Sequence, residues 1–230
     1  MPSAGRAIEM DHSSLAERYA RVKAGIPDGV MLVAVSKTRT AKEIQALYDL
    51  GHRDFGENYA QELRAKQPAL PGDIRWHFIG HLQRSNAKHI VPIAHLIHGV
   101  DGAALLDEID KRAAARGEAA DVLLQIHIAR EETKHGLSPD EARTVAGEIA
   151  AGRWPNVRVC GLMGMATNTT DQAQVKAEFL GLAELHRELA ERLGPGFKVL
   201  SMGMSSDLTP ALDAGSNLVR VGTAIFGERN

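Results

Sequence analysis

Short runs of apolar residues alternate with amphipathic stretches along most of the chain. The first clear run occupies 31–35, and the last occupies 218–221. Five others occupy 75–80, 95–100, 122–128, 157–163 and 198–202, and a weaker one surrounds 52–56. Runs with so few polar positions are typical of strands buried on both faces, as in a parallel sheet.

The segments between these runs carry apolar residues at every third or fourth position, which predicts helices with one buried face. Leu105, Ile109 and Ala113 show this spacing, and Ile44 and Leu47 show it after Thr40. The longest stripe comprises Val175, Phe179, Leu182, Leu185, Leu189 and Leu193. Four glycines follow such stretches, where a helix cap favours positive φ: Gly51, Gly117, Gly194 and Gly215.

Eight predicted strands alternating with helices indicate βα units. The chain of 230 residues is close to the typical length of an eightfold barrel, about 250 residues. We therefore predict a single-domain (β/α)8 TIM barrel over 1–230, preceded by an extra N-terminal helix over 14–23. No linker-like segment divides the sequence.

The composition narrows the range of partners. The 27 basic and 29 acidic residues give a net charge of −2, which offers no reason to expect nucleic acid or an anionic membrane surface as partner. The single cysteine, Cys160, cannot form an internal disulfide, and 1–10 shows no signal-peptide run. We expect a cytoplasmic, monomeric protein without a membrane helix.

Lys37 follows directly on the first predicted strand, in Val35-Ser36-Lys37-Thr38. Ligands of parallel α/β folds gather at the carboxyl ends of the strands. Desolvation there lowers the pKa of a lysine and exposes the lone pair that Schiff-base chemistry requires. The alternative is a lysine whose amine simply extends to solvent.

The ends of the last two predicted strands favour a phosphate site. Ser205 or Ser206 can cap the helix that follows 198–202, and Pro210 suits the first turn of that helix. Gly222 allows close backbone approach to a ligand, and Thr223 adds a hydroxyl group. Phosphate sites after strands seven and eight recur in these barrels, although ordinary capping and a tight turn would also explain the residues.

Six motifs together resemble the pyridoxal phosphate (PLP) homeostasis protein family, which is related to the barrel domain of alanine racemase. The motifs are VSKT at 35–38, FGENY at 55–59, WHFIGHLQ at 76–83, GLM at 161–163, MGMSSD at 202–207 and VRVGTAIFG at 219–227. They occur in the family's order and extend over nearly the whole chain. The resemblance implies a PLP-binding barrel.

The resemblance also implies roles for individual residues. Lys37 would form the internal aldimine, and Arg220 would lie near the pyridine nitrogen, with Asn58 near the cofactor. The phosphate would be surrounded by Ser205, Ser206, Gly222 and Thr223. The chain departs from the family pattern at Ser85-Asn86 and at His127, which concerns contacts at the rim.

The ten histidines raise the question of a metal site. His77 and His81 are expected on one strand face, and His95 lies near His98, but no carboxylate stands at obvious ligand spacing. We interpret these histidines as structural or solvent-facing. Cys160 lies inside an apolar run, so a buried, inert thiol is expected.

Three functions fit the residues. The first is a protein that holds PLP and supplies it to apo-enzymes; the second is a PLP-dependent amino-acid racemase or decarboxylase; the third is an isomerase that uses Lys37 without a cofactor. Racemisation needs a base on each face of the substrate carbon. Tyr19 and Tyr48 fall in helical stretches, and Tyr59 is expected to pack or to line the rim, so we favour the carrier, without turnover of its own.

Overall fold

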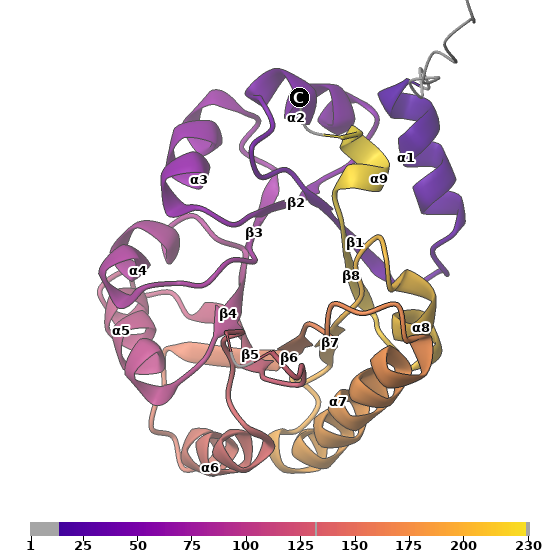
Figure 1. Cartoon of the computed structure of the whole chain (residues 1–230). Coiled ribbons are helices and arrows are strands. Elements are labelled where there is room, and N and C mark those ends of the chain that lie inside the picture. The colour runs from indigo at the N-terminus through magenta and orange to yellow at the C-terminus, as the bar shows by residue number, and fades with distance from the viewer. Residues whose placement is uncertain (1–13, 132, 229–230) are drawn as a thin grey trace, which may run out of the picture.

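The computed structural model describes residues 14–131 and 133–228 and shows a closed, eight-stranded parallel barrel (Figure 1). The strands are β1 (Met31–Val35), β2 (Asp54–Glu57), β3 (Arg75–Phe78), β4 (Leu96–Val100), β5 (Ala120–Ile126), β6 (Val157–Gly164), β7 (Val199–Ser201) and β8 (Leu218–Val221). Each strand pairs with the next, and β8 pairs with β1 from Met31↔Leu218 to Ala34↔Val221. The predicted TIM barrel is confirmed.

Helices surround the barrel as an outer ring (Figure 1). They are α1 (Leu15–Ala24), α2 (Ala41–Asp49), α3 (Ala60–Lys66), α4 (Arg84–Ile90), α5 (Ala103–Ala114), α6 (Pro139–Ala150), α7 (Gln172–Leu193), α8 (Leu208–Asp213) and α9 (Thr223–Phe226), with a 3-10 turn at Gln67–Ala69. The extra N-terminal helix is thus confirmed as α1. The predicted lack of a leader concerns residues outside those described.

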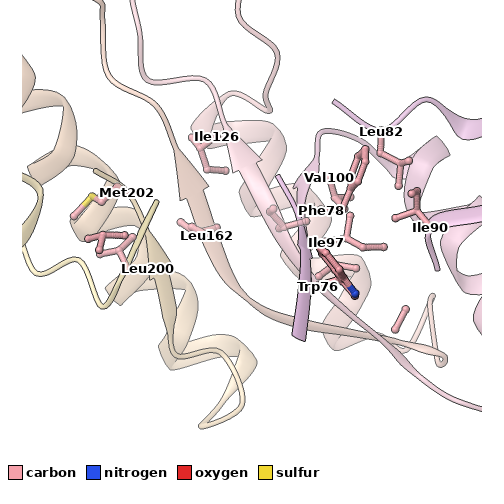
Figure 2. Packing of buried hydrophobic residues seen from close by; sticks show 14 of the residues in the cluster. Trp76, Phe78, Leu82, Ile90, Ile97, Val100, Ile126, Leu162, Leu200 and Met202 are labelled. Atoms are coloured by element: carbon pink, nitrogen blue, oxygen red, sulfur yellow. The ribbon is translucent and has the colours of Figure 1, made fainter. Parts of the chain in front are cut away.

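The apolar stripes of the helices pack against the strands to form the main core. Along α7, Val175, Phe179, Leu182, Leu185 and Leu189 are buried, whereas Leu193 is only partly covered. Figure 2 shows the strand side of this core, where Trp76, Phe78, Ile97 and Leu162 lie among its members. The predicted helix faces are therefore confirmed.

The interior of the barrel has an apolar layer and a polar layer. Val33, Leu96, Leu123, Met163 and Leu218 form a separate buried cluster. Two residues further along β4 and β8, on the same strand face, stand His98 and Arg220, which are also buried. His98 and Arg220 therefore lie closer to the carboxyl ends of their strands than the apolar cluster does.

The pairing of β5 with β6 contains a bulge. The register runs from Val122↔Val159 to Leu123↔Gly161, so Cys160 has no partner in the ladder. Gly161 has φ 156, and a Cβ there would lie 1.8 Å from the Val199 carbonyl oxygen. Cys160 is only partly buried, which corrects the expectation of a fully buried thiol. Within the described residues, no helix combines the length and apolarity needed to cross a bilayer.

Candidate functional site at the barrel mouth

The carboxyl ends of β1, β7 and β8 enclose a cavity of about 270 Å³. Its walls are formed by Val35, Lys37, Arg39, Met204, Ser205, Ser206, Arg220, Gly222 and Thr223. Six of the seven candidate residues from the sequence thus surround one space. Asn58 is not among the lining residues, although its Oδ1 atom is buried without a hydrogen-bond partner in the described part of the chain.

A strained turn carries Lys37 into this cavity. Thr38, the next residue, has φ 63, a left-handed conformation that a β-branched residue seldom adopts. The Thr38 N–H donates to Glu62 Oε2 at 2.7 Å, which holds the turn from α3. Such a conformation persists only where surrounding contacts enforce it.

A buried ion-pair network supports the same turn from below. Lys66 Nζ lies 2.8 Å from Glu57 Oε1 and 2.7 Å from Glu62 Oε2, and it donates to the Ser36 carbonyl at 3.0 Å. The Ser36 hydroxyl also donates to Glu57 Oε1, at 2.6 Å. Burial raises the pKa of Glu57, while the hydrogen bonds from Lys66 and Ser36 oppose that shift. The network fixes both ends of the Ser36–Thr38 segment.

The loop after β7 differs from the prediction at its helix start. Asp207, not Ser205 or Ser206, occupies the N-cap position of α8, and no side chain caps that helix. The Asp207 carboxylate instead accepts from the Met204 N–H. Both serines stand exposed in the preceding turn, so their hydroxyl groups are accessible from the cavity. Pro210 falls in the first turn of α8, as predicted.

The loop after β8 brings the last strand close to the first. A Cβ at Gly222 would lie 3.3 Å from the Val35 carbonyl oxygen, so glycine permits this approach. Gly222 is the N-cap residue of the short helix α9, and Thr223 is its exposed first residue. The seam between β8 and β1 therefore places Thr223 and Lys37 on one cavity.

Arg220 supplies a buried cation to the cavity wall. Its Nη1 donates to the Ser201 carbonyl at 3.0 Å and to the Ser201 hydroxyl, and its Nη2 donates to the Gly164 carbonyl at 3.1 Å. Burial lowers the pKa of Arg220 to about 10, and the charge of Asp207 opposes that shift. The guanidinium is therefore still charged at neutral pH.

These groups suit a small anionic ligand with a reactive carbonyl. Lys37 supplies an amine, while Ser205, Ser206 and Thr223 supply hydroxyl donors to an anion. Arg220 adds a permanent positive charge and can only donate hydrogen bonds. The cavity thus combines covalent capture with recognition of negative charge.

A second group of side chains could hold a metal ion. His81, Asp101 and His135 follow β3, β4 and β5, and one ligand atom of each lies within 4.8 Å of the others. His81 Nδ1 lies 3.2 Å from Asp101 Oδ2, and the rings of His81 and His135 stack with centroids 4.0 Å apart. The hydrogen bond and the stacking account for this arrangement without an ion.

The remaining rim residues lie away from the cavity walls. His77 is buried in β3, whereas His81 is exposed beyond the strand end, so they do not share a strand face. His127 follows β5, and its Nε2 lies 2.9 Å from the Glu131 carbonyl oxygen. Ser85 and Asn86 belong to the first turn of α4.

Sequence reasoning missed the groups that hold Lys37 and Arg220 in place. Glu57 and Lys66 are nine residues apart, and nothing in their spacing indicates a pair. Ser201 and His98 come from strands that are distant in sequence. A buried polar position in an otherwise apolar strand was the available signal for Glu57, His98 and Ser201, because such a group needs a partner.

Comparison with known proteins agrees with this geometry. Residues 10–230 match the family model of the alanine racemase N-terminal domain. The pyridoxal phosphate homeostasis protein of Mus musculus is 41% identical over 211 residues, which cover 86% of this chain and 77% of the relative. That of Pseudomonas aeruginosa is 36% identical over 229 residues, covering 95% and 97%.

Solved structures place the chain in the same group. PipY of Synechococcus elongatus PCC7942 without PLP has a TM-score of 0.88 and 35% identity, covering 93% of this chain and all of PipY. PipY with PLP bound has a TM-score of 0.84. Alanine racemase from Bartonella henselae, 13% identical with a TM-score of 0.73, shares the fold. The chain therefore belongs to the pyridoxal phosphate homeostasis protein family, within the alanine racemase N-terminal domain fold.

Proposed function

We propose that this protein binds PLP in the cavity at the β8–β1 seam and acts in PLP homeostasis by holding the cofactor and supplying it to apo-enzymes. The observation that carries the proposal is the convergence of Lys37, Arg220 and three hydroxyl groups on one cavity. The names of the relatives and the PLP-bound PipY structure support it. PLP supplies an aldehyde that condenses reversibly with a primary amine.

The lining residues divide into three roles in this proposal. Lys37 binds the aldehyde carbon covalently. Ser205, Ser206, Gly222 and Thr223 bind the phosphate through hydroxyl and N–H groups, and Arg220 donates to the pyridine nitrogen. Asn58 does not line the cavity, and its buried Oδ1 has no hydrogen-bond partner among the described residues, so we assign it a role near the cofactor rather than in contact with the phosphate.

The lining residues favour holding the cofactor over amino-acid turnover. Racemisation requires a second proton-transfer group opposite the lysine. Among the described residues that line the cavity, none is Tyr, His, Cys, Asp or Glu. Arg220 as a donor also keeps the pyridine nitrogen unprotonated, which weakens the ring as an electron sink. Displacement of the Lys37 nitrogen from the aldehyde carbon, by water or by a free amine, would release the cofactor.

Borohydride reduction followed by peptide mass mapping tests the binding site. The adduct should fall on Lys37, and Lys37→Ala should lose the visible absorbance of the wild type. Lys198→Ala, in the loop before β7, serves as the matched control and should retain the absorbance. An adduct mainly on Lys134 or Lys198 would refute the assignment of Lys37.

A transfer assay tests the function. Loaded protein mixed with an apo-enzyme should restore the activity of that enzyme, whereas loaded protein alone should not exchange the α-proton of L-amino acids in deuterated water. Exchange on the order of 1 s⁻¹ or faster would identify a racemase instead.

A further inference from the structure

A chain of buried side chains crosses the barrel interior and ends at Arg220. Asp54 Oδ1 lies 3.2 Å from His77 Nε2, and His77 Nδ1 lies 3.0 Å from His98 Nε2. His98 Nδ1 lies 3.2 Å from Ser201 Oγ, which accepts from Arg220 Nη1. The members come from β2, β3, β4, β7 and β8, and each is less than 9% exposed.

The Asp54 end of this chain fixes the direction of every hydrogen bond when both rings are neutral. A guanidinium only donates and a carboxylate only accepts. Burial lowers the pKa of His77 and, further, that of His98, so both rings are neutral, with one donor and one acceptor nitrogen each. Ser201 therefore donates to His98, His98 donates to His77, and His77 donates to Asp54. Both histidines carry their proton on Nε2.

The opposite direction fails at the Asp54 end, and at the other end it leaves the Ser201 O–H without an acceptor among these groups. Neutral histidines with their proton on Nδ1 would direct two donors at Ser201 Oγ and would leave a nitrogen lone pair facing the Asp54 carboxylate. Arg75 donates to that carboxylate through Nε at 2.7 Å. Burial opposes ionisation of Asp54, yet the hydrogen bonds from His77 and Arg75 outweigh it and hold its pKa well below the usual range.

We propose that Ser201, His98, His77 and Asp54 are positioning residues that hold the Arg220 guanidinium toward the cofactor's ring nitrogen. The effect on cofactor binding rests on the proposed function, whereas the chain itself rests on the hydrogen bonds between Asp54 and Arg220. Ser201 and Gly164 together occupy three of the five N–H groups of Arg220. The aligned chain polarises Ser201 Oγ toward the cation and fixes the guanidinium plane, so that the remaining donors keep one orientation in the cavity wall.

Nitrogen-15 NMR of the histidine rings in the cofactor-free protein tests the chain directly. Protonated Nε2 and unprotonated Nδ1 on both His77 and His98 at neutral pH are expected. A proton on Nδ1 of either ring, or a doubly protonated ring, would overturn the proposed direction. Because the measurement uses cofactor-free protein, it tests the hydrogen-bond chain independently of PLP binding. Failure of the wild type to bind PLP would refute the proposed function but not the chain.

Binding of PLP and of its 1-deaza analogue, which lacks the ring nitrogen, tests the consequence. Ser201→Ala should lower the affinity for PLP about tenfold. Its affinity for the analogue should stay within about twofold of the wild-type value for the analogue. Ser201→Thr restores the hydroxyl and should recover PLP affinity. Ser216→Ala is the matched control, since its buried hydroxyl donates to the Met202 carbonyl at 2.7 Å and makes no contact with Arg220.

A second variant keeps the positioning role testable if Ser201→Ala does not fold. His98→Asn places a side-chain amide near the position of the histidine Nδ1. The amide can still form a hydrogen bond with Ser201, but the shorter side chain cannot form one with His77. A loss of about threefold in PLP affinity, again without loss for the analogue, is expected. Wild-type affinity in both variants, or equal losses for PLP and its analogue, would overturn the positioning role.

Discussion

At the scale of single residues, a second lysine supports the turn that carries Lys37. Lys66 is mostly buried, and it bridges Glu57 and Glu62 beneath the turn that carries Lys37. Removing one partner of a buried ion pair leaves the other charge uncompensated. The resulting loss in the free energy of unfolding is larger than the net contribution of the intact pair.

Lys66→Met should therefore lower the free energy of unfolding by about 3 kcal/mol. It should also slow the reaction of Lys37 with aldehydes, because the Ser36–Thr38 segment loses its support. Urea denaturation measures the first effect. Lys42→Met, at an exposed position of α2, should change stability by less than about 0.5 kcal/mol. Equal stability of the two variants would contradict the role of the network.

Asp54 should make the free energy of unfolding depend on pH in the acid range. Its pKa in the folded protein lies below the value of an unfolded aspartate, about 3.9, so its ionisation stabilises the fold above that value. This stabilisation is lost as the pH falls from about 4 toward the lower, folded-state pKa. Asp54→Asn should therefore flatten the acid side of the stability curve.

The measurement is the free energy of unfolding between about pH 2 and 7, a range that spans ordinary carboxyl pKa values. Asp28→Asn, at an exposed loop position, is the control and should keep the wild-type slope. A wild-type slope in Asp54→Asn would show that another carboxylate carries the acid sensitivity.

The sequence predicts a site residue only when the residue's role follows from its neighbours along the chain. Lys37 was found because its position after an apolar strand places its amine at the mouth. Ser205 and Ser206 were placed on the right loop but given the wrong structural role, since Asp207 is the N-cap residue and its carboxylate accepts from the Met204 N–H. The Asp54–Arg220 chain joins five strands, so no local pattern reveals it.

At the scale of elements, the β6 bulge is a feature that depends on one glycine. The apolar run at 157–163 predicted the strand but not the extra residue, because the run Val157–Gly164 has the same polarity with or without a bulge. The bounds of β1 and β8 were correct, since polar or turn residues flank both strands closely. In the other strands, at least one end shifted by one or two residues, because apolar residues continue past the hydrogen-bonded ladder or stop short of it.

Gly161→Ala should destabilise the protein by more than about 3 kcal/mol, since its Cβ would overlap the backbone of β7 at a left-handed φ. Gly181→Ala in α7 meets nothing within 4 Å and should instead stabilise by about 0.5–1 kcal/mol. Chemical denaturation of the two variants side by side measures the difference. A tolerated Gly161→Ala would show that the bulge can relax.

At the scale of the whole molecule, we propose that the chain is one domain and a monomer. The large apolar side chains exposed among the described residues are scattered over different elements: Met31, Leu50, Tyr59, Leu180 and Met204. No contiguous apolar face emerges from them that would drive association. Light scattering during size exclusion should give a mass near 24.8 kDa. A concentration-independent mass of twice that value would refute the monomer.

Bound cofactor should stabilise the whole barrel, because a ligand that binds only the folded state adds RT ln(1 + [L]/Kd). Pyridoxal phosphate at 100 times its Kd should add about 2.7 kcal/mol to the free energy of unfolding. Pyridoxal without the phosphate at equal concentration serves as the control and should add much less. Equal stabilisation by the two compounds would place the phosphate outside the site.

The seam between β8 and β1 also has a consequence in time. Lys37 is synthesised nearly two hundred residues before Thr223. The cavity therefore cannot exist on an incomplete nascent chain, whatever part of the barrel has already condensed. A nascent chain that ends before Thr223 would carry the lysine turn without the hydroxyl donor on the opposite side of the β8–β1 seam.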